Sequence, residues 1–357
     1  MGKVPRFKHT LIAVGFGIIT VSTNSFASTL SAQLSAAIHH HNIPTPVGIS
    51  STLESVIDKR LVGEAMPTTP ESTEEWLKAV KFANKEPAQL ALKAAKELDV
   101  SFEKSSIAGV ETFVVTPATI NPRYADHYFM HLHGGAFVFG GEEAALREAI
   151  WMANGLGVKV ISVDYRKPPL HPFPAAIDDA VAVWKDITSK QEASKTVIFG
   201  TSAGGNLTLT TTLRLKEQGL PMPGALFAGT PATDLAHTSD SWLTLEGLDP
   251  LGRRAGLLQS TFDLYAANNN LENPLISPVY GELNNFPPTL LISGTRDLLL
   301  SDTVRMHRAL RAAGVSADLH IYDGQSHADY LLGLAHNLPE SDDALAELNA
   351  FFSTHLN

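Results

Sequence analysis

The spacing of hydrophobic positions changes near residue 110 and divides the chain into two regions. Between residues 71 and 100 the apolar side chains recur at intervals that suit amphipathic helices; they are Trp76, Leu77, Val80, Phe82, Leu90, Leu92, Ala95 and Leu98. Strand signals are few from residue 28 to residue 110, and prolines at positions 44, 46, 67 and 70 mark breaks. We therefore predict a helical region over 28–110, which forms either a cap or a plain helical extension packed against the main domain.

Beyond residue 110, short β-rich runs alternate with longer segments of helical pattern. The predicted strands are 111–116, 127–131, 159–163, 196–199, 225–228, 289–293 and 317–322. The predicted helices are 142–154, 175–188, 203–217, 302–313 and 343–352. Strands that alternate with helices in this way form parallel sheets through crossover connections. The prediction for 111–357 is an α/β domain with a mostly parallel, doubly wound sheet.

The segment 234–286 interrupts this alternation. It is rich in glycine, asparagine and proline and has no clear strand pattern. We predict an insertion over the carboxyl edge of the sheet, the edge at which ligands bind in such folds. The depth of any pocket then depends on how this insertion and the N-terminal helices cover that edge.

The first 27 residues have the layout of a secretory signal peptide. Lys3, Arg6 and Lys8 precede an apolar run at 11–21, and a small-residue cleavage site ends at Ala27. An uncleaved membrane anchor is the alternative, but the run has about 11 residues and a spanning helix needs roughly 20. We predict export to the periplasm or the medium, with cleavage that removes three positive charges and changes the formal net charge from −10 to −13.

Composition excludes several classes of site and partner. With 44% hydrophobic and 18% charged residues, a chain of 357 residues can bury a large core. The net charge of −10, with no basic run beyond the N-terminus, excludes nucleic acid and anionic lipid as partners. The absence of cysteine excludes disulfides, thiolate catalysis and cysteine-ligated zinc. His39, His40 and His41 could bind a metal ion, but a solvated turn or helix face explains them better.

The strongest chemical signal is Gly200-Thr201-Ser202-Ala203-Gly204, which lies between a predicted strand and a predicted helix. In a Gly-x-Ser-x-Gly turn the glycines permit a tight, strained backbone that exposes the serine hydroxyl at the helix N-terminus. The helix dipole there favours developing negative charge. The motif alone often occurs by chance, but the strand before it and the helix after it support a nucleophile at Ser202.

A second signal, His133-Gly134-Gly135, follows the predicted strand at 127–131. Successive glycines leave backbone N–H groups unobstructed, and these can stabilise the oxyanion of a tetrahedral intermediate. Gly134 and Gly135 would supply two donors, and Ala203, directly after the candidate nucleophile, a third. The alternative is an ordinary glycine turn after a strand. The position of His133-Gly134-Gly135, about 70 residues before Ser202, disfavours that alternative.

A serine nucleophile needs a base, and the base needs a carboxylate that fixes its tautomer. The predicted strand 289–293 leads to Asp297, and the predicted strand 317–322 leads through a short loop to His327. We predict that Ser202, Asp297 and His327 are nucleophile, acid and base, since their order along the chain is that of α/β-hydrolases. This chemistry requires no metal ion and no cofactor.

Other acids and histidines fit these roles less well. Asp302 is expected to cap the helix that follows it, and Asp323 to lie in the loop that supports the catalytic histidine. His307 falls in a predicted helix and His320 in a predicted strand, while His336 lies well past the loop.

Together these motifs resemble those of the bacterial hormone-sensitive-lipase-like esterases, also called family IV. The family's His-Gly-Gly motif corresponds to His133-Gly134-Gly135, and its nucleophile elbow corresponds to residues 200–206. A further family stretch is similar to residues 164–176, which lead to Asp179. The resemblance covers roughly residue 111 to the C-terminus and implies an α/β-hydrolase fold with an N-terminal helical cap.

The resemblance also implies activity on short-acyl esters and, by family likeness alone, a homodimer. Ala136 stands where the family commonly has a third glycine, which would crowd the acyl or alcohol pocket without removing the two N–H donors. Thr201 stands where many members have aspartate, so the chain resembles the threonine-containing branch. The run 294–302 is similar to that of lactone-cleaving relatives, which makes a lactone an alternative substrate.

Two other classes compete with a serine carboxylesterase. Some relatives are non-catalytic ligand receptors that have lost the catalytic histidine, whereas His327 is retained here. Peptidases on this fold usually carry a propeller or a comparable large domain, for which the region before residue 110 leaves no room. We therefore expect hydrolysis of short- to medium-acyl esters.

Overall fold

The computed structural model describes residues 43–60 and 69–356. The predicted signal peptide and the run His39-His40-His41 lie outside these residues, so both predictions stay predictions. Within the described part of the chain, no helix is long and apolar enough to cross a membrane.

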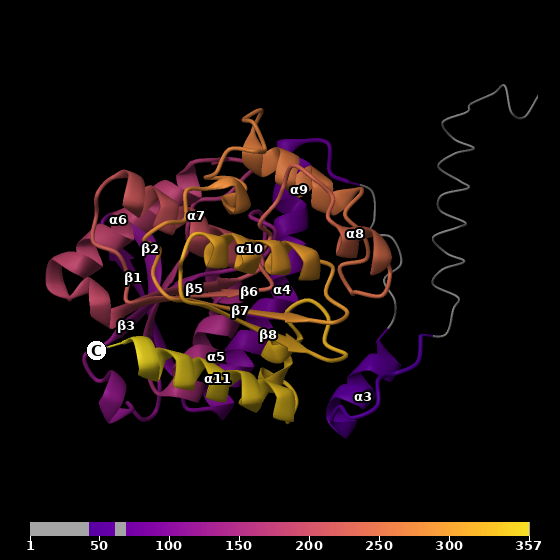
Figure 1. Cartoon of the computed structure of the whole chain (residues 1–357), viewed down its shortest axis with the longest axis horizontal. Helices are drawn as coiled ribbons and strands as arrows, with labels where there is room; N and C mark the ends of the chain where they lie inside the picture. Colours follow the sequence, from indigo (N-terminus) through magenta and orange to yellow (C-terminus); the bar gives the residue numbers. More distant parts are fainter. Residues whose placement is uncertain (1–42, 61–68, 357) are drawn as a thin grey trace, which may run out of the picture. The chain divides into compact units, whose positions relative to one another are not determined.

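The centre of the fold is an eight-stranded sheet in the order β1-β2-β4-β3-β5-β6-β7-β8 (Figure 1). Its strands are β1 (Ser101–Ile107), β2 (Val110–Thr116), β3 (Tyr128–Leu132), β4 (Lys159–Val163), β5 (Thr196–Thr201), β6 (Ala225–Gly229), β7 (Thr289–Gly294) and β8 (Ala317–Tyr322). Strand β2 pairs antiparallel with β1 and β4, and every other neighbouring pair is parallel. The prediction of a mostly parallel, doubly wound α/β sheet is confirmed.

Helices cover both faces of this sheet (Figure 1). One hydrophobic core joins the sheet to α6 (Ala175–Lys190), α7 (Ala203–Glu217) and α10 (Leu300–Ala312). The other core joins it to α4 (Thr73–Glu97), α5 (Leu146–Leu156) and α11 (Pro339–His355). Because apolar helices lie on both sides, the central strands β5, β6 and β7 are buried at every position.

The N-terminal region is only partly helical. It contains α3 (Ser51–Lys59) and α4, which begins at a capping box formed by Ser72 and Glu75. The prediction of a helical region up to residue 110 is wrong beyond α4, because β1 follows it. β1 is an edge strand whose side chains are mostly exposed, so its sequence Ser-Phe-Glu-Lys-Ser-Ser-Ile lacks the alternation that predicts a half-buried strand.

The segment 234–286, all of whose residues are described, contains two α-helices, one short 3-10 helix (Pro278–Tyr280) and, as predicted, no strand. The α-helices are α8 (Asp240–Thr244) and α9 (Leu257–Ala266). Helix α9 packs on the loop after β3, where the Tyr265 ring stacks on the Phe137 ring with centroids 4.1 Å apart. The insertion therefore covers the loop that carries the His-Gly-Gly motif.

Candidate active site

The backbone turn at Ser202 joins the buried strand β5 to helix α7. Ser202 has φ 63° and ψ −120°, a strained conformation for a residue with a side chain. A methyl group on Gly200 or Gly204 would lie only 2.1 or 1.9 Å from the Leu132 carbonyl oxygen. The end of β3 therefore packs directly against the turn, and only glycines fit this contact.

The His-Gly-Gly loop lies against the same turn. A methyl group on Gly134 would lie 2.8 Å from the Thr201 carbonyl oxygen and 3.5 Å from Ser202 Cβ. Gly135 has φ 111°, a conformation that side chains rarely permit. Among the backbone hydrogen bonds between described residues outside regular helices and strands, none has Gly134, Gly135 or Ala203 as its donor. These three N–H groups have no such competing acceptor, which the predicted oxyanion hole requires.

His133 fixes the shape of this loop. Its Nδ1 lies 2.7 Å from the Gly134 carbonyl oxygen, and its ring stacks on Tyr165 with centroids 4.1 Å apart. Burial, together with the charge of Lys167, lowers the pKa of His133 to about 3, so the ring is neutral. With Nδ1–H donated to Gly134, Nε2 accepts from Lys167 Nζ at 3.4 Å. The family stretch 164–176 thus supplies side chains that hold the His-Gly-Gly loop.

The loop continues through two residues with left-handed backbone. Ala136 has φ 51° and Phe137 has φ 66°. The backbone at Ala136, where the family commonly has a third glycine, is therefore left-handed in spite of the methyl group. Phe137 is fully buried against Tyr265. The loop is held by Tyr165 at one end and by α9 at the other.

Asp297 and His327 meet in the loops that follow β7 and β8. Asp297 is fully buried, and its Oδ1 lies 3.0 Å from Nδ1 of His327. The carboxylate also accepts from Ser293 Oγ at 2.6 Å and from Leu299 N at 2.9 Å. These bonds fix the orientation of the carboxylate, as expected of an acid that holds the tautomer of a base.

Charges around His327 favour its protonated form. Burial by itself lowers its pKa, but the hydrogen bond and charge of Asp297, with the charges of Asp249 and Asp329, raise it above the ordinary value. A base with a raised pKa accepts a proton more readily from a serine hydroxyl.

A buried polar network joins the serine turn to the histidine loop. The Thr201 hydroxyl donates to Glu148 Oε1 at 2.6 Å and contacts the Tyr330 hydroxyl. Glu148 Oε2 also lies 3.2 Å from Nε2 of His131, on β3. Tyr330 follows His327 closely in the same loop, so the two halves of the candidate site meet here. Sequence reasoning missed Glu148, because a glutamate at the start of a helix is normally read as a surface residue.

One rival acid behaves differently from its prediction. Asp302 does not cap α10, because that helix begins two residues earlier, at Leu300. Its buried carboxylate instead accepts from the N–H groups of Thr233 and Asp234 and from Ser239 Oγ, at 3.1, 3.2 and 2.7 Å. Asp302 thus holds the insertion onto α10.

The remaining rivals lie outside the candidate site or support it. Asp323 lies in the loop before His327, as predicted, and it also accepts from Thr295 Oγ1 at 3.0 Å, which joins the acid and histidine loops. The structure places His307 in α10, His320 in β8 and His336 after the histidine loop.

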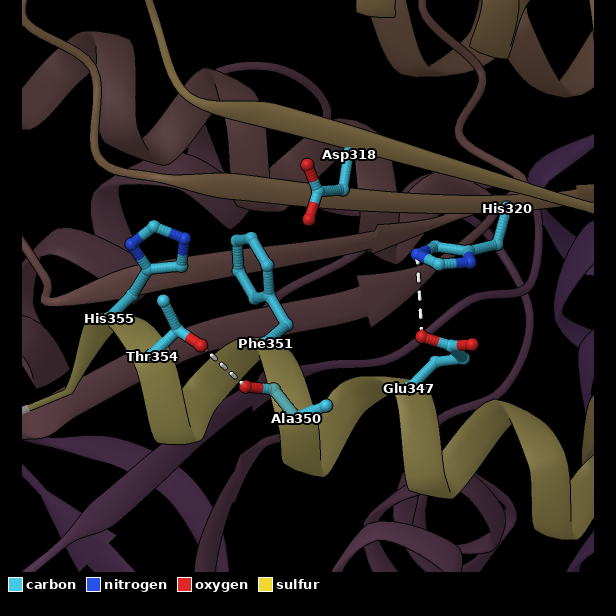
Figure 2. A pocket seen from close by; sticks show the side chains of 7 residues that line it. All are labelled: Asp318, His320, Glu347, Ala350, Phe351, Thr354 and His355. Atoms are coloured by element: carbon cyan, nitrogen blue, oxygen red, sulfur yellow. Dashed lines mark hydrogen bonds and ion pairs between the residues drawn. The ribbon is translucent and has the colours of Figure 1, made fainter.

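A groove of about 190 Å³ lies between β8 and α11 (Figure 2). It is lined by Asp318, His320, Glu347, Ala350, Phe351, Thr354 and His355. Because none of the predicted site residues lines it, the groove is separate from the candidate active site. In the described part of the chain, no group of three His, Asp or Glu side chains could hold a metal ion.

Comparisons with known sequences agree with this geometry. Residues 129–331 match a family model described as the α/β hydrolase fold. An esterase from Acinetobacter venetianus is 32% identical over 235 residues, which are 65% of this chain and 76% of that protein. An acetyl-hydrolase from Streptomyces hygroscopicus is 28% identical over 226 residues, 63% of this chain and 75% of its own length.

Solved structures show the same likeness. The crystal structure of an esterase named E25 has a TM-score of 0.86 and 43% identity, covering 88% of this chain and 97% of that chain. An esterase from the bacterial hormone-sensitive lipase family has a TM-score of 0.73 and 27% identity, covering 86% and 99%. The likeness thus extends over most of the described fold.

Proposed function

The chain belongs to the α/β hydrolase family, among the hormone-sensitive-lipase-like esterases, and on that premise we propose that it hydrolyses short- to medium-acyl esters through an acyl-enzyme at Ser202. As a member of this family it is a carboxylesterase-type hydrolase. The proposal concerns the identity of the reacting groups and the class of acyl chain.

The contact between Asp297 and His327 carries the proposal: Asp297 Oδ1 lies 3.0 Å from Nδ1 of His327. Gly134, in the loop after β3, packs against the strained turn at Ser202, which follows the neighbouring strand β5. The contact of Thr201 with Tyr330 joins these two parts. A base, its orienting acid, a serine on a strained turn and available N–H donors are the parts that acyl transfer needs.

The proposed reaction begins with attack of Ser202 Oγ on the ester carbonyl carbon. His327 Nε2 takes the hydroxyl proton, and Asp297 stabilises the imidazolium through Nδ1–H. When the tetrahedral intermediate collapses, the proton passes from His327 to the leaving alkoxide, which departs as the alcohol. Water then attacks the acyl-enzyme by the same route and releases the carboxylic acid and free Ser202.

The N–H groups of Gly134, Gly135 and Ala203 are proposed to stabilise the oxyanion in both steps. They are backbone groups on rigid turns, so they need no rearrangement when negative charge develops on the carbonyl oxygen. Ala203 is also the first residue of α7, whose dipole favours that charge.

The preference for short acyl chains is supported by two observations. An acetyl-hydrolase is among the relatives, and Ala136 places a methyl group in the oxyanion loop where a third glycine would leave more room. A lactone remains the alternative substrate because of the run 294–302.

Replacement of the proposed nucleophile tests the mechanism. Ser202→Ala is expected to reduce kcat for p-nitrophenyl butyrate by at least about 10⁴-fold, since the acyl-enzyme cannot form. Ser189→Ala, which removes the hydroxyl of an exposed residue on α6, is the matched control and should keep wild-type turnover. Wild-type turnover by Ser202→Ala would refute the proposal.

A substrate series tests the acyl and ring preferences. kcat/KM for p-nitrophenyl esters from acetate to palmitate is expected to be highest among the short chains and to fall toward the longest. A γ-lactone assayed beside them should be hydrolysed more slowly than the best ester. A maximum at palmitate would contradict the acyl preference, and faster lactone hydrolysis would favour the alternative substrate.

A further inference from the structure

The loop between α8 and α9, which is part of the insertion, contributes a buried carboxylate next to the proposed catalytic pair. Asp249 is 0% exposed, although it lies in a loop of the insertion. Its Oδ1 accepts from Leu251 N at 2.8 Å, and its Oδ2 accepts from Leu298 N at 3.0 Å and His327 N at 2.9 Å. Three backbone amides from three separate loops therefore converge on one carboxylate.

Two of these amides belong to the loops that carry the proposed acid and base. Leu298 directly follows Asp297, and the third amide is that of His327 itself. We propose that Asp249 is a positioning residue that fixes the two loops relative to each other and stabilises the imidazolium form of His327. This inference rests on the proposed function of Asp297 and His327.

The charge of Asp249 has no cationic side chain among its hydrogen-bond donors in the described residues, which are all backbone amides. Burial raises the pKa of Asp249 to about 6, an effect that the charge of His327 opposes and that of Asp297 reinforces. Asp329, the third carboxylate whose charge raises the pKa of His327 beside Asp297 and Asp249, is paired with Arg60 at 2.7 Å. Asp249 is therefore the supporting charge near the imidazole that no ion pair compensates.

This arrangement assigns Asp249 a part in the proton transfer without contact with substrate. When Ser202 gives its proton to Nε2, His327 becomes positive while Nδ1–H stays bonded to Asp297. The negative charge of Asp249 then lowers the free energy of the imidazolium, and its bond to His327 N keeps the ring aligned.

Asp249→Asn isolates the charge from most of the geometry. The side-chain oxygen of asparagine can still accept from Leu298 and His327, while its NH₂ group turns toward Leu251, where a donor would face a donor. Asp302→Asn is the matched control. Asp302 is equally buried, and burial also raises its pKa to about 6. It accepts from backbone amides too, but these belong to Thr233 and Asp234, at the start of the insertion.

The experiment is a pH profile of kcat/KM for p-nitrophenyl butyrate with wild type, Asp249→Asn and Asp302→Asn, after circular dichroism has shown each to be folded. For Asp249→Asn we expect kcat to fall by up to about tenfold, because the imidazolium loses a stabilising charge and one pKa unit corresponds to a factor of about ten. The midpoint of the acid limb should move down by about half to one pH unit, because loss of a nearby negative charge lowers the pKa of His327. Asp302→Asn should keep the wild-type midpoint even if its melting temperature is lower.

An unchanged acid limb in Asp249→Asn, with or without lower activity, would overturn the proposal, as would an equal shift in Asp302→Asn. If Asp249→Asn does not fold, Asp249→Ser takes its place, because its smaller hydroxyl also removes the charge. The midpoint of its acid limb should move down in the same direction, and an unchanged midpoint would overturn the proposal. Ser202→Ala distinguishes failure of the proposed function from failure of the role proposed for Asp249. If Ser202→Ala keeps activity, the proposed function is wrong. If it loses activity, an unchanged acid limb in Asp249→Asn refutes only the role of Asp249.

Discussion

At the scale of single residues, the candidate site depends on how closely backbone can approach backbone. Gly200 and Gly204 have no space for a methyl group beside the Leu132 carbonyl oxygen, and Gly134 has none beside Thr201. A neutral His133 then holds the loop against this turn. The nucleophile turn and the predicted oxyanion loop are therefore one packed unit.

The raised pKa of His327 predicts the pH dependence of the reaction. The base must be neutral, so kcat/KM should fall as the pH decreases through a midpoint above about 6.5, the ordinary value for histidine. Asp297→Asn removes the hydrogen bond and charge that raise this pKa, so its midpoint should be lower and its kcat reduced by about 10⁴-fold. Initial rates from pH 5 to about 9 measure both. A wild-type midpoint well below the ordinary histidine value would contradict this account.

Single residues were predictable where they stand at the ends of recognisable strands. Asp297 follows the buried strand β7 and His327 follows the edge strand β8, and the structure brings the two side chains within hydrogen-bonding distance. Asp302 was wrongly assigned as a cap, because its partners in the insertion are distant in sequence. Asp249 could not be found in this way, since no local pattern shows which loop amides a buried carboxylate will accept from.

At the scale of elements, the N-terminal helices fasten the two catalytic loops. Asn84 on α4 accepts from Gly140 N at 2.8 Å, at the end of the loop that carries the His-Gly-Gly motif. Arg60, directly after α3, donates to Ser326 Oγ and Asp329 Oδ1, both at 2.7 Å. These contacts explain why the helices stay close to the site, whether or not they act as a cap.

Arg60→Ala should loosen the histidine loop. It leaves Asp329, whose side chain is 5% exposed, without its cation, so we expect the free energy of unfolding to fall by about 3 kcal/mol and kcat to decrease. Lys78→Ala breaks an exposed ion pair with Glu74 and is the control, with an expected loss below about 0.5 kcal/mol. Urea titration followed by fluorescence gives both values. Equal effects of the two substitutions would show that Arg60 has no special role.

Most elements were predictable because their apolar positions follow the geometry of a two-sided core. β4 and α7 begin and end as predicted, and so does the edge strand β8, whose apolar residues Ala317, Leu319 and Ile321 alternate with polar ones. β1 was missed, since an exposed edge strand has no hydrophobic face to reveal it. In α4, Pro87 lies inside a continuous helix, within the stretch 71–100 for which helical spacing was predicted.

At the scale of the whole molecule, the acidic charge and the N-terminal pattern concern compartment rather than catalysis. We propose that the chain is exported and cleaved after Ala27, because Lys3, Arg6 and Lys8 precede a short apolar run. Expression of the full chain in a Gram-negative host should give a periplasmic or secreted esterase that begins at Ser28, as read by N-terminal sequencing. Replacement of the three cations by glutamine should leave the uncleaved chain in the cells. A mature protein that begins at Met1 would contradict the proposal.

The most direct test of the account is to trap the nucleophile. Phenylmethylsulfonyl fluoride sulfonylates an activated serine, so peptide mapping by mass spectrometry after inactivation should find one adduct, on the peptide that contains Ser202. His327→Ala should slow the modification by several orders of magnitude, because the base that activates the hydroxyl is lost. Full inactivation with Ser202 unmodified, or an adduct on another serine, would contradict the central claim.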